Sequence, residues 1–485
     1  MKRYLCSLLL ACLLLTGCEL SSSPPVSPGL DGSLPPQSEN NSGGSGPVGP
    51  ATLTTSGGGG TTSPTGATGS TLTGASAGTT TPSSAVSSKA SAPSSPPEPT
   101  APSGTPSDAP SSNPGSDPSV DPQEEFRGVW ISYIELGAML KNQSAAQARQ
   151  ALDTMLDDCL SFGMNAVIFH VRANSDAYYP SSLFKPAASV KALLEEGFDP
   201  LAYAVQAAHA RGLELHAWVN PYRIGRNLEY RVEGIDYFQD KGASPAYWYA
   251  PTSLEAQKLI LSGIEELLAY DIDGIQFDDY FYPHDVLPAD APADFEKAEY
   301  EASGGHLSIG DWRRAHVDAL ISSVYSRVHK KTGCVFGVSP SHDYAGTREK
   351  GYADTVKWLQ KTGYVDYLCP QIYFGFEHQS SRFDKVLAEW LAFRPASTVK
   401  LYVGLGTYKI GLAPDKWAGT GQQEWAENDD IMNRSVELLR QKKVGGMMFY
   451  SYSYFLPDSV VPSSGQTYDR DVAKREVENL LTLLR

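Results

Sequence analysis

Short apolar runs alternate with helix-length amphipathic segments eight times between Arg127 and Arg485. The runs are RGVWISY, NAVIFHVR, LELHAWVNPYR, DGIQFDDYFYP, CVFGVSPSHD, VDYLCPQIYF, KLYVGLGTY and VGGMMFYSYSYF. Helical patterns follow them near residues 145–162, 199–211, 253–270, 309–332, 353–362, 382–393, 428–442 and 470–484. This rhythm predicts an α/β fold, a closed parallel (β/α)8 TIM barrel. An open, doubly wound sheet is the alternative, and it is weakened because no glycine-rich nucleotide fingerprint follows the first run.

Each run begins apolar and ends polar or aromatic. Because successive side chains of a strand face opposite sides, the residues that share a face can be assigned. In the fourth run Ile275 and Phe277 form the face that packs on helices, which turns Gln276, Asp278 and Tyr280 into the barrel. The same reasoning turns further residues inward: His170, Arg172, His216, Trp218, Asn220, Ser339, Ser341, Gln371, Tyr373, Tyr450 and Tyr452. We predict a binding site at the carboxyl ends of the strands, where this fold places its sites.

Two adjacent aspartates, Asp278 and Asp279, end the fourth run. Asp278 has the inward parity and is the principal catalytic candidate. Asp279 points away while strand geometry lasts. In that case its side chain caps the following turn. If the chain has already turned at this position, the side chain instead lies over the site.

Four segments resemble a known family. FRGVW, DGIQFDDYFYP, CPQIYF and GGMMFYSYSYF are similar to segments of the bacterial glycosyl-hydrolase-like 10 (DUF187-type) lipoproteins, and the resemblance extends over nearly all of residues 126–485. It implies a TIM-type barrel with glycoside hydrolase activity, which in some members acts on peptidoglycan glycan strands stripped of their peptides. Carried over by position, it marks Asp278 and Asp279 as the acidic residues of the site.

Chitinases with the D-G-x-D-x-D-x-E signature offer a more distant comparison. They also begin the fourth strand with Asp-Gly and keep an aspartate where Asp278 stands. Their proton-donating glutamate falls on Tyr280, and their preceding aspartate falls on Gln276. Gln371 and Tyr373 resemble the residues that hold a substrate N-acetyl group in such enzymes. The chitinase mechanism therefore does not transfer intact, because its proton donor is missing.

Glycoside hydrolysis usually needs two carboxyl groups that flank the bond. Adjacent strand residues normally diverge, so a partner is expected from another loop, where Asp176, Asp343 and Glu377 are the open candidates. Each is otherwise a loop-capping or solvated acid. Arg172 or Arg223 has the geometry to hold a substrate carboxylate such as a lactyl group, or else pairs with a rim aspartate.

Ring-bearing side chains complete the predicted substrate-binding set: Trp218, Tyr222, Tyr282, His342, Tyr450 and Tyr452. Trp130 also offers a flat face, with a core position as the alternative. The nine histidines are scattered, without His-Glu-x-x-His, so we expect neither metal nor cofactor. Ser341, His342 and Asp343 are consecutive, and consecutive residues rarely converge as a hydrolase triad.

The first part of the chain has a different character. Residues 1–18 combine Lys2 and Arg3, an apolar run and the sequence Leu-Thr-Gly-Cys, which predicts a lipoprotein signal peptide with a lipidated Cys18. An ordinary signal peptide with a chance cysteine is the alternative. Residues 19–124 are dominated by Ser, Thr, Pro, Gly and Ala, which predicts a disordered linker. Residues 125–485 are predicted to form the barrel domain.

We therefore expect a monomeric glycoside hydrolase of the cell envelope, outside the cytoplasm, that meets the membrane only through its lipid anchor. Its expected substrate is a β-linked, N-acetylated glycan, and specifically a peptidoglycan strand. The net charge of −16 argues against nucleic acid as a partner. A catalytically silent sugar-binding module is the alternative, because the chitinase-type glutamate is missing. Cys159, Cys334 and Cys369 have no metal-like spacing and are expected to be buried thiols, with one disulfide as the alternative.

Overall fold

The structure, a computed structural model, describes residues 125–485 except residue 243 and residues 284–286. The predicted signal peptide over residues 1–18, the lipidated Cys18 and the linker over residues 19–124 lie outside the described residues and stay predictions. Among the helices of the described part, none combines the length and the apolar character that a membrane span requires.

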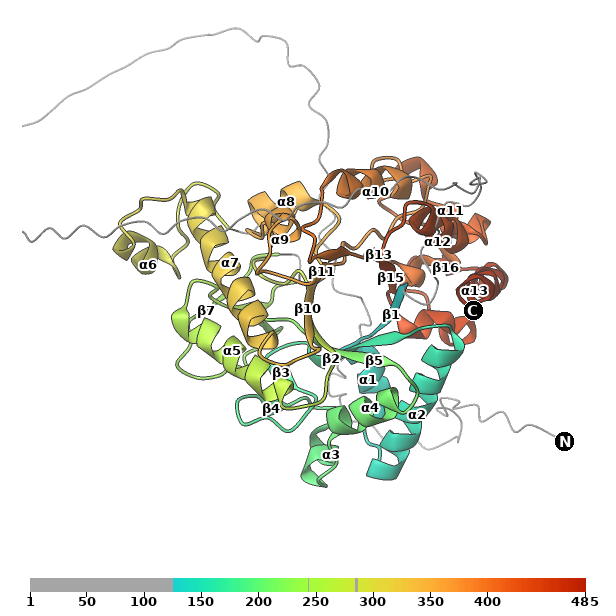
Figure 1. Cartoon of the computed structure of the whole chain (residues 1–485), viewed down its shortest axis with the longest axis horizontal. Coiled ribbons are helices and arrows are strands. Elements are labelled where there is room, and N and C mark those ends of the chain that lie inside the picture. The colour runs from blue at the N-terminus through green and yellow to red at the C-terminus, as the bar shows by residue number, and fades with distance from the viewer. Residues whose placement is uncertain (1–124, 243, 284–286) are drawn as a thin grey trace, which may run out of the picture. The chain divides into compact units, whose positions relative to one another are not determined.

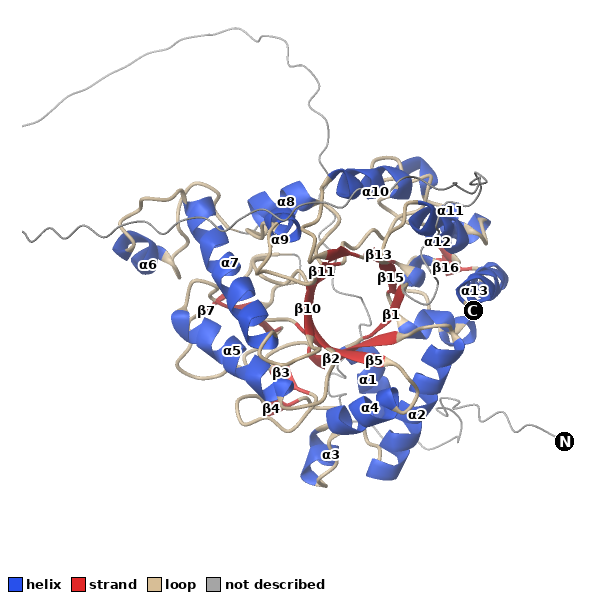
Figure 2. Ribbon diagram, in the orientation of Figure 1, coloured by secondary structure: helices blue, strands red, loops and turns tan. Residues whose placement is uncertain are grey.

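A ring of parallel strands forms the centre of the domain, with helices around it (Figures 1 and 2). One sheet contains β12-β11-β10-β9-β5-β2-β1-β15-β13 in that order. Lys400–Leu401 (β12) pairs with β11, and Val403–Leu405 (β13) pairs with β15. Only Tyr402 separates β12 from β13, so these two pieces of one strand join the ends of the sheet. The ring is closed, which confirms the predicted barrel and excludes the open sheet.

All eight predicted strand–helix units are present. The other ring strands are Phe126–Ile131 (β1), Ala166–Arg172 (β2), Glu214–Val219 (β5), Gly274–Phe277 (β9), Val335–Val338 (β10), Tyr367–Leu368 (β11) and Gly446–Phe449 (β15). The helices that follow them are Ala145–Ser161 (α2), Pro200–His209 (α4), Leu254–Leu268 (α5), Ile309–Val328 (α7), Thr355–Gln360 (α9), Phe383–Ala392 (α10), Ile431–Gln441 (α12) and Arg470–Leu484 (α13).

Shorter elements decorate this frame. The additional helices are Tyr133–Leu140 (α1), Lys191–Glu195 (α3), Lys297–Ala302 (α6), Tyr344–Lys350 (α8) and Glu424–Glu427 (α11), with single 3-10 turns at Thr407–Lys409 (η1), Gly419–Gly421 (η2), Tyr452–Phe455 (η3) and Pro457–Ser459 (η4). Three small sheets contain Asp176–Ala177 (β3) with Lys185–Pro186 (β4), Leu412–Ala413 (β14) with Thr467–Tyr468 (β16), and Arg223–Gly225 (β6) with Tyr237–Gln239 (β7) and Tyr247–Tyr249 (β8).

The long helices bury one apolar stripe each, and α5 illustrates why they form. Its buried residues recur at the spacing of a helical face: Ala256, Leu259, Ile260, Gly263, Ile264 and Leu267. The hydroxyl of Ser253 accepts a hydrogen bond from the N–H of Ala256 at 3.3 Å and so caps the first turn.

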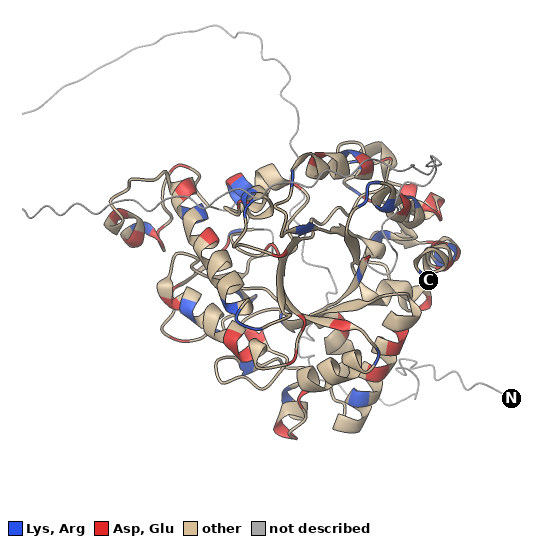
Figure 3. Cartoon of the chain, in the orientation of Figure 1, with Lys and Arg blue, Asp and Glu red and all other residues tan. Residues whose placement is uncertain are grey.

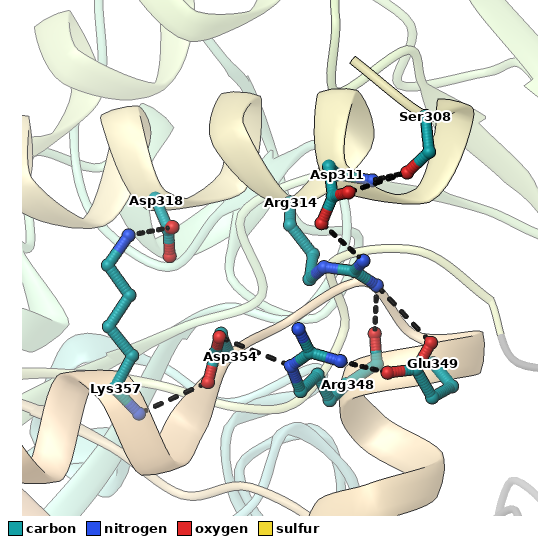
Figure 4. Close-up of polar contacts among 8 residues, drawn as sticks. All are labelled: Ser308, Asp311, Arg314, Asp318, Arg348, Glu349, Asp354 and Lys357. Atoms are coloured by element: carbon teal, nitrogen blue, oxygen red, sulfur yellow. Dashed lines mark hydrogen bonds and ion pairs between the residues drawn. The ribbon is translucent and has the colours of Figure 1, made fainter.

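Charged residues of both signs lie on the helices around the ring (Figure 3). Figure 4 shows one network that connects α7 to α8 and α9. Arg314 of α7 contacts Asp311 at 2.7 Å and Glu349 at 3.5 Å, and Lys357 donates to Asp318 at 2.5 Å. Partly exposed pairs of this kind contribute little singly, so the network mainly fixes how these helices lie against one another.

Apolar side chains pack in two clusters on the two sides of the ring. The outer cluster lies between strands and helices and contains Ile275 and Phe277, as their parity predicts. The inner cluster fills the barrel with Trp130, Ile168, Trp218, Tyr367, Cys369, Tyr402 and Met448.

Rings close the end of the barrel at which the strands begin. Phe126 stacks on Tyr402 with centroids 4.7 Å apart, and Nδ1 of His216 lies 3.0 Å from the Tyr367 hydroxyl. A Cβ atom at Gly337 would lie 2.0 Å from the Tyr367 ring, so only glycine leaves room for this packing. We refer to these rings as the aromatic floor. An open site is therefore confined to the other end.

The three cysteines of the described part are buried and free, which confirms the expected thiols. Within the same residues, no group of three His, Cys, Asp or Glu side chains has a metal-binding arrangement.

Candidate active site

A cavity of about 670 Å³ opens at the carboxyl ends of the ring strands. This volume lies within the usual range for small-molecule sites. Most of the predicted site residues line it: His170, Trp218, Asn220, Arg223, Asp278, Asp279, Tyr280, Tyr282, Gln371, Tyr373 and Tyr450. The polar bowl predicted from strand parity is thus present, at the end opposite the aromatic floor.

Asp278 is the first residue after β9 and is 8% exposed. Its Oδ1 accepts hydrogen bonds from the backbone N–H of Asp279 at 2.9 Å and from Nε2 of Gln371 at 2.9 Å. The same Gln371 nitrogen donates to the carbonyl of Ser339 at 3.0 Å. Residues that follow three neighbouring strands therefore fix the orientation of one carboxyl group.

Asp279 also lines the cavity. Strand β9 ends at Phe277, and the N–H of Phe281 donates to the carbonyl of Asp279 at 2.9 Å, so the chain turns immediately after the strand. Strand parity no longer applies there. Of the orientations left open by the sequence, the return over the site is the one observed.

The two aspartates form a coupled acid pair. Burial raises the pKa of Asp278 to about 6, against hydrogen bonds from Asp279 and Gln371 and the positive charge of Arg223, which lower it. Burial, followed by the charge of Asp278, raises the pKa of Asp279 well above its ordinary range. Two adjacent carboxyl groups resist double ionisation, so the pair retains one proton over a wide pH range.

The other carboxyl groups in the cavity wall are already engaged. Asp240 accepts from the N–H of Gly242 at 2.9 Å and from Nε1 of Trp248 at 2.7 Å. Asp415 forms an ion pair with Lys409 at 2.9 Å. Among the described residues of the wall, the acid pair therefore contains the carboxyl groups that are available for catalysis.

The three open candidates for a second carboxylate lie elsewhere. Asp343 caps α8 by accepting from the N–H of Gly346 at 2.8 Å, and Asp176 accepts from the N–H of Asn174 at 3.0 Å. Glu377 is exposed outside the cavity wall. Asp176 and Asp343 thus have the loop-capping role that was their alternative.

Ring systems form much of the remaining wall. His170 stacks on Trp218 with centroids 3.6 Å apart and an interplanar angle of 12°. Tyr373 lies nearly parallel to Tyr450, 6.0 Å away. The Arg223 guanidinium lies 5.5 Å from the centroid of the Tyr280 ring, beside the acid pair.

Several buried polar atoms in the wall have no hydrogen-bond partner among the described residues. They are Nε2 of His170, Nε1 of Trp218 and Oδ1 of Asn220. Burial lowers the pKa of His170 well below its usual range, and Nδ1 of this residue accepts from the N–H of Tyr133 at 3.3 Å. The neutral imidazole therefore carries its proton on Nε2. Unpaired buried groups of this kind are costly, which is consistent with a polar ligand.

Comparison with known proteins identifies the family. A model of the family described as glycosyl hydrolase-like 10 matches residues 125–422. The chain belongs to the glycosyl hydrolase-like 10 family. Glycosyl hydrolase YngK of Bacillus subtilis is 33% identical over 359 residues, which are 67% of this chain and 68% of that protein. Glycosyl hydrolase DigH of Escherichia coli K12 is 31% identical over 366 residues, which are 65% of this chain and 81% of that protein.

The family match in this glycosyl hydrolase-like 10 protein ends before the last ring strand. Gly446–Phe449 (β15) pairs with β1 and completes the barrel, and Tyr450 and Tyr454 behind it line the cavity. The segment GGMMFYSYSYF, which resembles the family in sequence, therefore contains a strand that is needed to close the barrel.

Two predicted site residues face inward but lie too deep. His216 belongs to the aromatic floor, where its Nε2 also lies 3.3 Å from Glu214. Gln276 is fully buried beneath the cavity, and its Oε1 accepts from Nε1 of Trp130 at 3.0 Å. Neither residue lines the cavity, so the prediction that they bind substrate placed them wrongly. The alternation of a strand predicts which face a side chain is on, but it does not predict how deep in the barrel that side chain lies.

Arg172 is wrong in its direction. The register of β2 shifts between His170 and Arg172, so these residues no longer share a face. The Arg172 guanidinium is buried 3.6 Å from the Phe184 ring centroid, away from the cavity, and has no hydrogen-bond partner among the described residues. It holds neither a substrate carboxylate nor a rim aspartate.

Three further predictions fail because the strands end earlier than expected. Tyr222 follows the end of β5 and is buried in the outer cluster. Tyr452 begins η3, and its hydroxyl donates to Asp158 of α2 at 2.8 Å. His342 packs against Phe374, with centroids 4.6 Å apart, and burial lowers its pKa to about 4. None of the three lines the cavity.

Sequence reasoning missed the cavity residues that lie outside the ring strands: Asp240 and Trp248, then Tyr408, Lys409, Asp415 and Trp417, then Val461, Ser463, Ser464 and Gln466. The seventh run ends in polar and aromatic residues like the others, so Tyr408, its last residue, could have been predicted from the sequence. The remaining loop residues have no periodicity that would have identified them.

Proposed function

We propose that this glycosyl hydrolase-like 10 protein hydrolyses β-linked, N-acetylated glycans, with peptidoglycan strands as its substrate, outside the cytoplasm and anchored through lipidated Cys18. The acid pair in the cavity carries the proposal. Hydrolysis of a glycoside requires a proton for the leaving oxygen and a carboxylate to oppose the positive charge that develops on the sugar. A pair that shares one proton supplies both at the same time.

The two aspartates have different surroundings, which suggests different roles for them. We assign Asp279 as the proton donor, because burial and the charge of Asp278 raise its pKa well above its ordinary range, and Asp278 as the carboxylate, because Gln371 and Arg223 favour its charged form. Gln371 donates to Asp278 and keeps its carboxylate fixed. This division of roles makes Asp278 the residue whose ionisation sets the acidic limb of activity.

The wall around the pair suits a sugar polymer. Trp218, Tyr373 and Tyr450 present flat apolar surfaces, and the unpaired nitrogen and oxygen atoms among His170, Trp218 and Asn220 suit hydroxyl and amide groups. Arg223 adds one positive charge, which suits the lactyl carboxylate of a muramic acid.

The test uses the full chain with purified peptidoglycan strands, both stripped of their peptides and intact. We expect new reducing ends and shorter glycans by mass spectrometry, with the stripped strands preferred. D278N removes the charge with little change in shape and should reduce the rate at least about a thousandfold, as loss of a catalytic group does. Asp271→Asn is the matched control, because its side chain is 87% exposed at the far end of the same segment. Binding without cleavage by the wild-type protein would overturn the hydrolase and point to a sugar-binding module.

The anchor is tested separately. A bacterium that expresses the chain and is fed a labelled fatty acid should label the wild-type protein and not the Cys18→Ser variant. Labelling of both, or of neither, would contradict the proposed lipidation.

A further inference from the structure

The acid pair has a geometry that does not fit the usual division of labour between two catalytic carboxyl groups. Retaining glycosidases hold them about 5 Å apart, and inverting enzymes about 6.5–9.5 Å apart. Asp278 and Asp279 are neighbours in the chain, and their carboxyl groups are hydrogen-bonded to each other. A glycosidic bond with its attacking group cannot lie between two groups in such contact.

No other carboxyl group of the described wall is available to take the opposite side. Asp240 is held by a backbone N–H and by Trp248, and Asp415 is paired with Lys409. The attacking group must therefore be water without a carboxylate partner, or a group that the substrate brings.

We propose that the nucleophile is the carbonyl oxygen of the substrate's own N-acetyl group, with Asp279 as proton donor and Asp278 as the acceptor that orients the acetamido N–H. The proposal rests on the proposed function and deepens it, because it restricts the substrate to glycans whose cleaved residue carries a 2-acetamido group. It also explains how the chain works with Tyr280 at the position of the chitinase glutamate: the proton donor has moved to the adjacent aspartate.

In the first step the acetamido oxygen forms a bond to C1 as the bond from C1 to the leaving oxygen breaks. The proton of Asp279 moves to that oxygen. The bicyclic oxazolinium that remains carries a positive charge, and its N–H donates to the Asp278 carboxylate. After this step both aspartates are ionised side by side. The oxazolinium cation, which lies between the acid pair and the solvent, offsets the repulsion between the two carboxylates.

In the second step a water molecule attacks C1, and the bond from C1 to the acetamido oxygen breaks. The water's proton returns to Asp279, so one water is consumed and both carboxyl groups regain their starting states. Two displacements at C1 leave the anomeric configuration unchanged. Gln371 holds the Asp278 carboxylate in place for the acetamido N–H, and Tyr373, which is 4% exposed, lines the same cavity.

The titration of the pair agrees with these roles. Burial and the charge of Asp278 raise the pKa of Asp279 well above its ordinary range, which favours the protonated form that a donor needs. The pKa of Asp278 is raised to about 6, so the acceptor is ionised under the same conditions.

The first test changes the substrate and leaves the protein intact. The 2-acetamido groups of stripped strands, or of an aryl N-acetylglucosaminide, are replaced by trifluoroacetamido groups, whose carbonyl oxygen is a much weaker nucleophile. We expect the wild-type rate to fall at least about a hundredfold, and proton NMR of early products to show a retained anomer. Equal rates on the two substrates, or an inverted product, would overturn the proposal.

The second test separates the two aspartates. With a 2,4-dinitrophenyl leaving group, which needs no proton, the first step in D279N should retain most of the wild-type rate, while D278N should remain impaired. The opposite order would overturn the assigned roles. Thermal melts establish that both variants fold, and Asp271→Asn is again the control. If the wild-type chain cleaves no glycan, the proposed function itself fails; if it cleaves trifluoroacetylated and natural strands alike, only the acetamido mechanism fails.

Discussion

The side-chain amide of Gln371 donates a hydrogen bond of 2.9 Å to the carboxylate of Asp278, although the two residues are separated by 93 positions in the chain. They meet because β9, β10 and β11 are neighbours in the ring and all end at the cavity. The barrel thereby brings together functional side chains that are far apart in the sequence.

Removal of this bond should change the pH dependence of activity. A donor to the carboxylate stabilises its charged form, so Gln371→Leu should raise the pKa of Asp278 further and move the acidic limb of kcat/KM upward by about one pH unit. The limb is measured on stripped strands or an aryl glycoside. Gln206→Leu, at an exposed position of α4, is the control. An unchanged limb in Gln371→Leu would show that Asp278 does not govern it.

The same carboxyl group should cost stability at neutral pH. Because burial raises its pKa from 3.8 to about 6, the folded state binds the proton more tightly than the unfolded chain. Its contribution to stability is full below about pH 4 and is lost as the pH rises through about 6, a loss of about 3 kcal/mol. D278N cannot ionise. Urea denaturation should therefore show D278N more stable than wild type at about pH 8 and similar to it at about pH 4; lower stability at the higher pH would contradict this.

A buried ion pair near the cavity should be sensitive to loss of one partner. Arg313 and Glu296 have fully buried side chains, and Nε of Arg313 donates to Glu296 at 2.9 Å. Glu296→Gln leaves the guanidinium without its counter-charge and should lower the free energy of unfolding by about 3–5 kcal/mol.

The control for that variant is Glu301→Gln. Glu301 lies 4.0 Å from Lys297 at the surface, and both side chains are more than half exposed. Its replacement should cost less than about 0.5 kcal/mol in the same urea titration. Similar costs for the two variants would mean that the buried pair has no special role.

Trp417 should extend the site along a polymer. It lines the cavity rim with 62% of its surface exposed, on a loop held by the Lys409–Asp415 ion pair. We expect Trp417→Ala to raise KM for long strands about tenfold, equivalent to about 1.4 kcal/mol, and to leave kcat and short substrates unaffected. Leu254→Ala, at a similarly exposed position outside the cavity, is the control. A parallel loss on short and long substrates would assign Trp417 to the catalytic step instead.

Periodicity predicted the barrel because each strand and helix has its own local pattern. It also predicted the side to which Ile275, Phe277 and Trp218 turn, since regular strand geometry holds at those positions. Prediction failed where that geometry changes. A register shift turns Arg172 outward, and the early end of β15 removes Tyr452 from the site.

The alternation of apolar and polar residues predicts neither the depth of a side chain in the barrel nor the positions of loop residues. His216 has the predicted inward face and still lies in the floor, because alternation does not record the layer in which a side chain lies. Asp415 and Trp417 come from a segment with little regular structure, and their position depends on contacts with residues far along the chain. The adjacency of Asp278 and Asp279 was visible in the sequence, whereas their mutual hydrogen bond required the turn after β9.

The ring strands all run in one direction, and Glu125 lies where the first of them starts, beside the aromatic floor. The described part of the chain therefore begins at the closed end of the barrel, and the cavity opens at the opposite end. Among the described residues, the entrance is thus formed by residues at or after the carboxyl ends of the strands, and the point at which the chain enters the barrel takes no part in it.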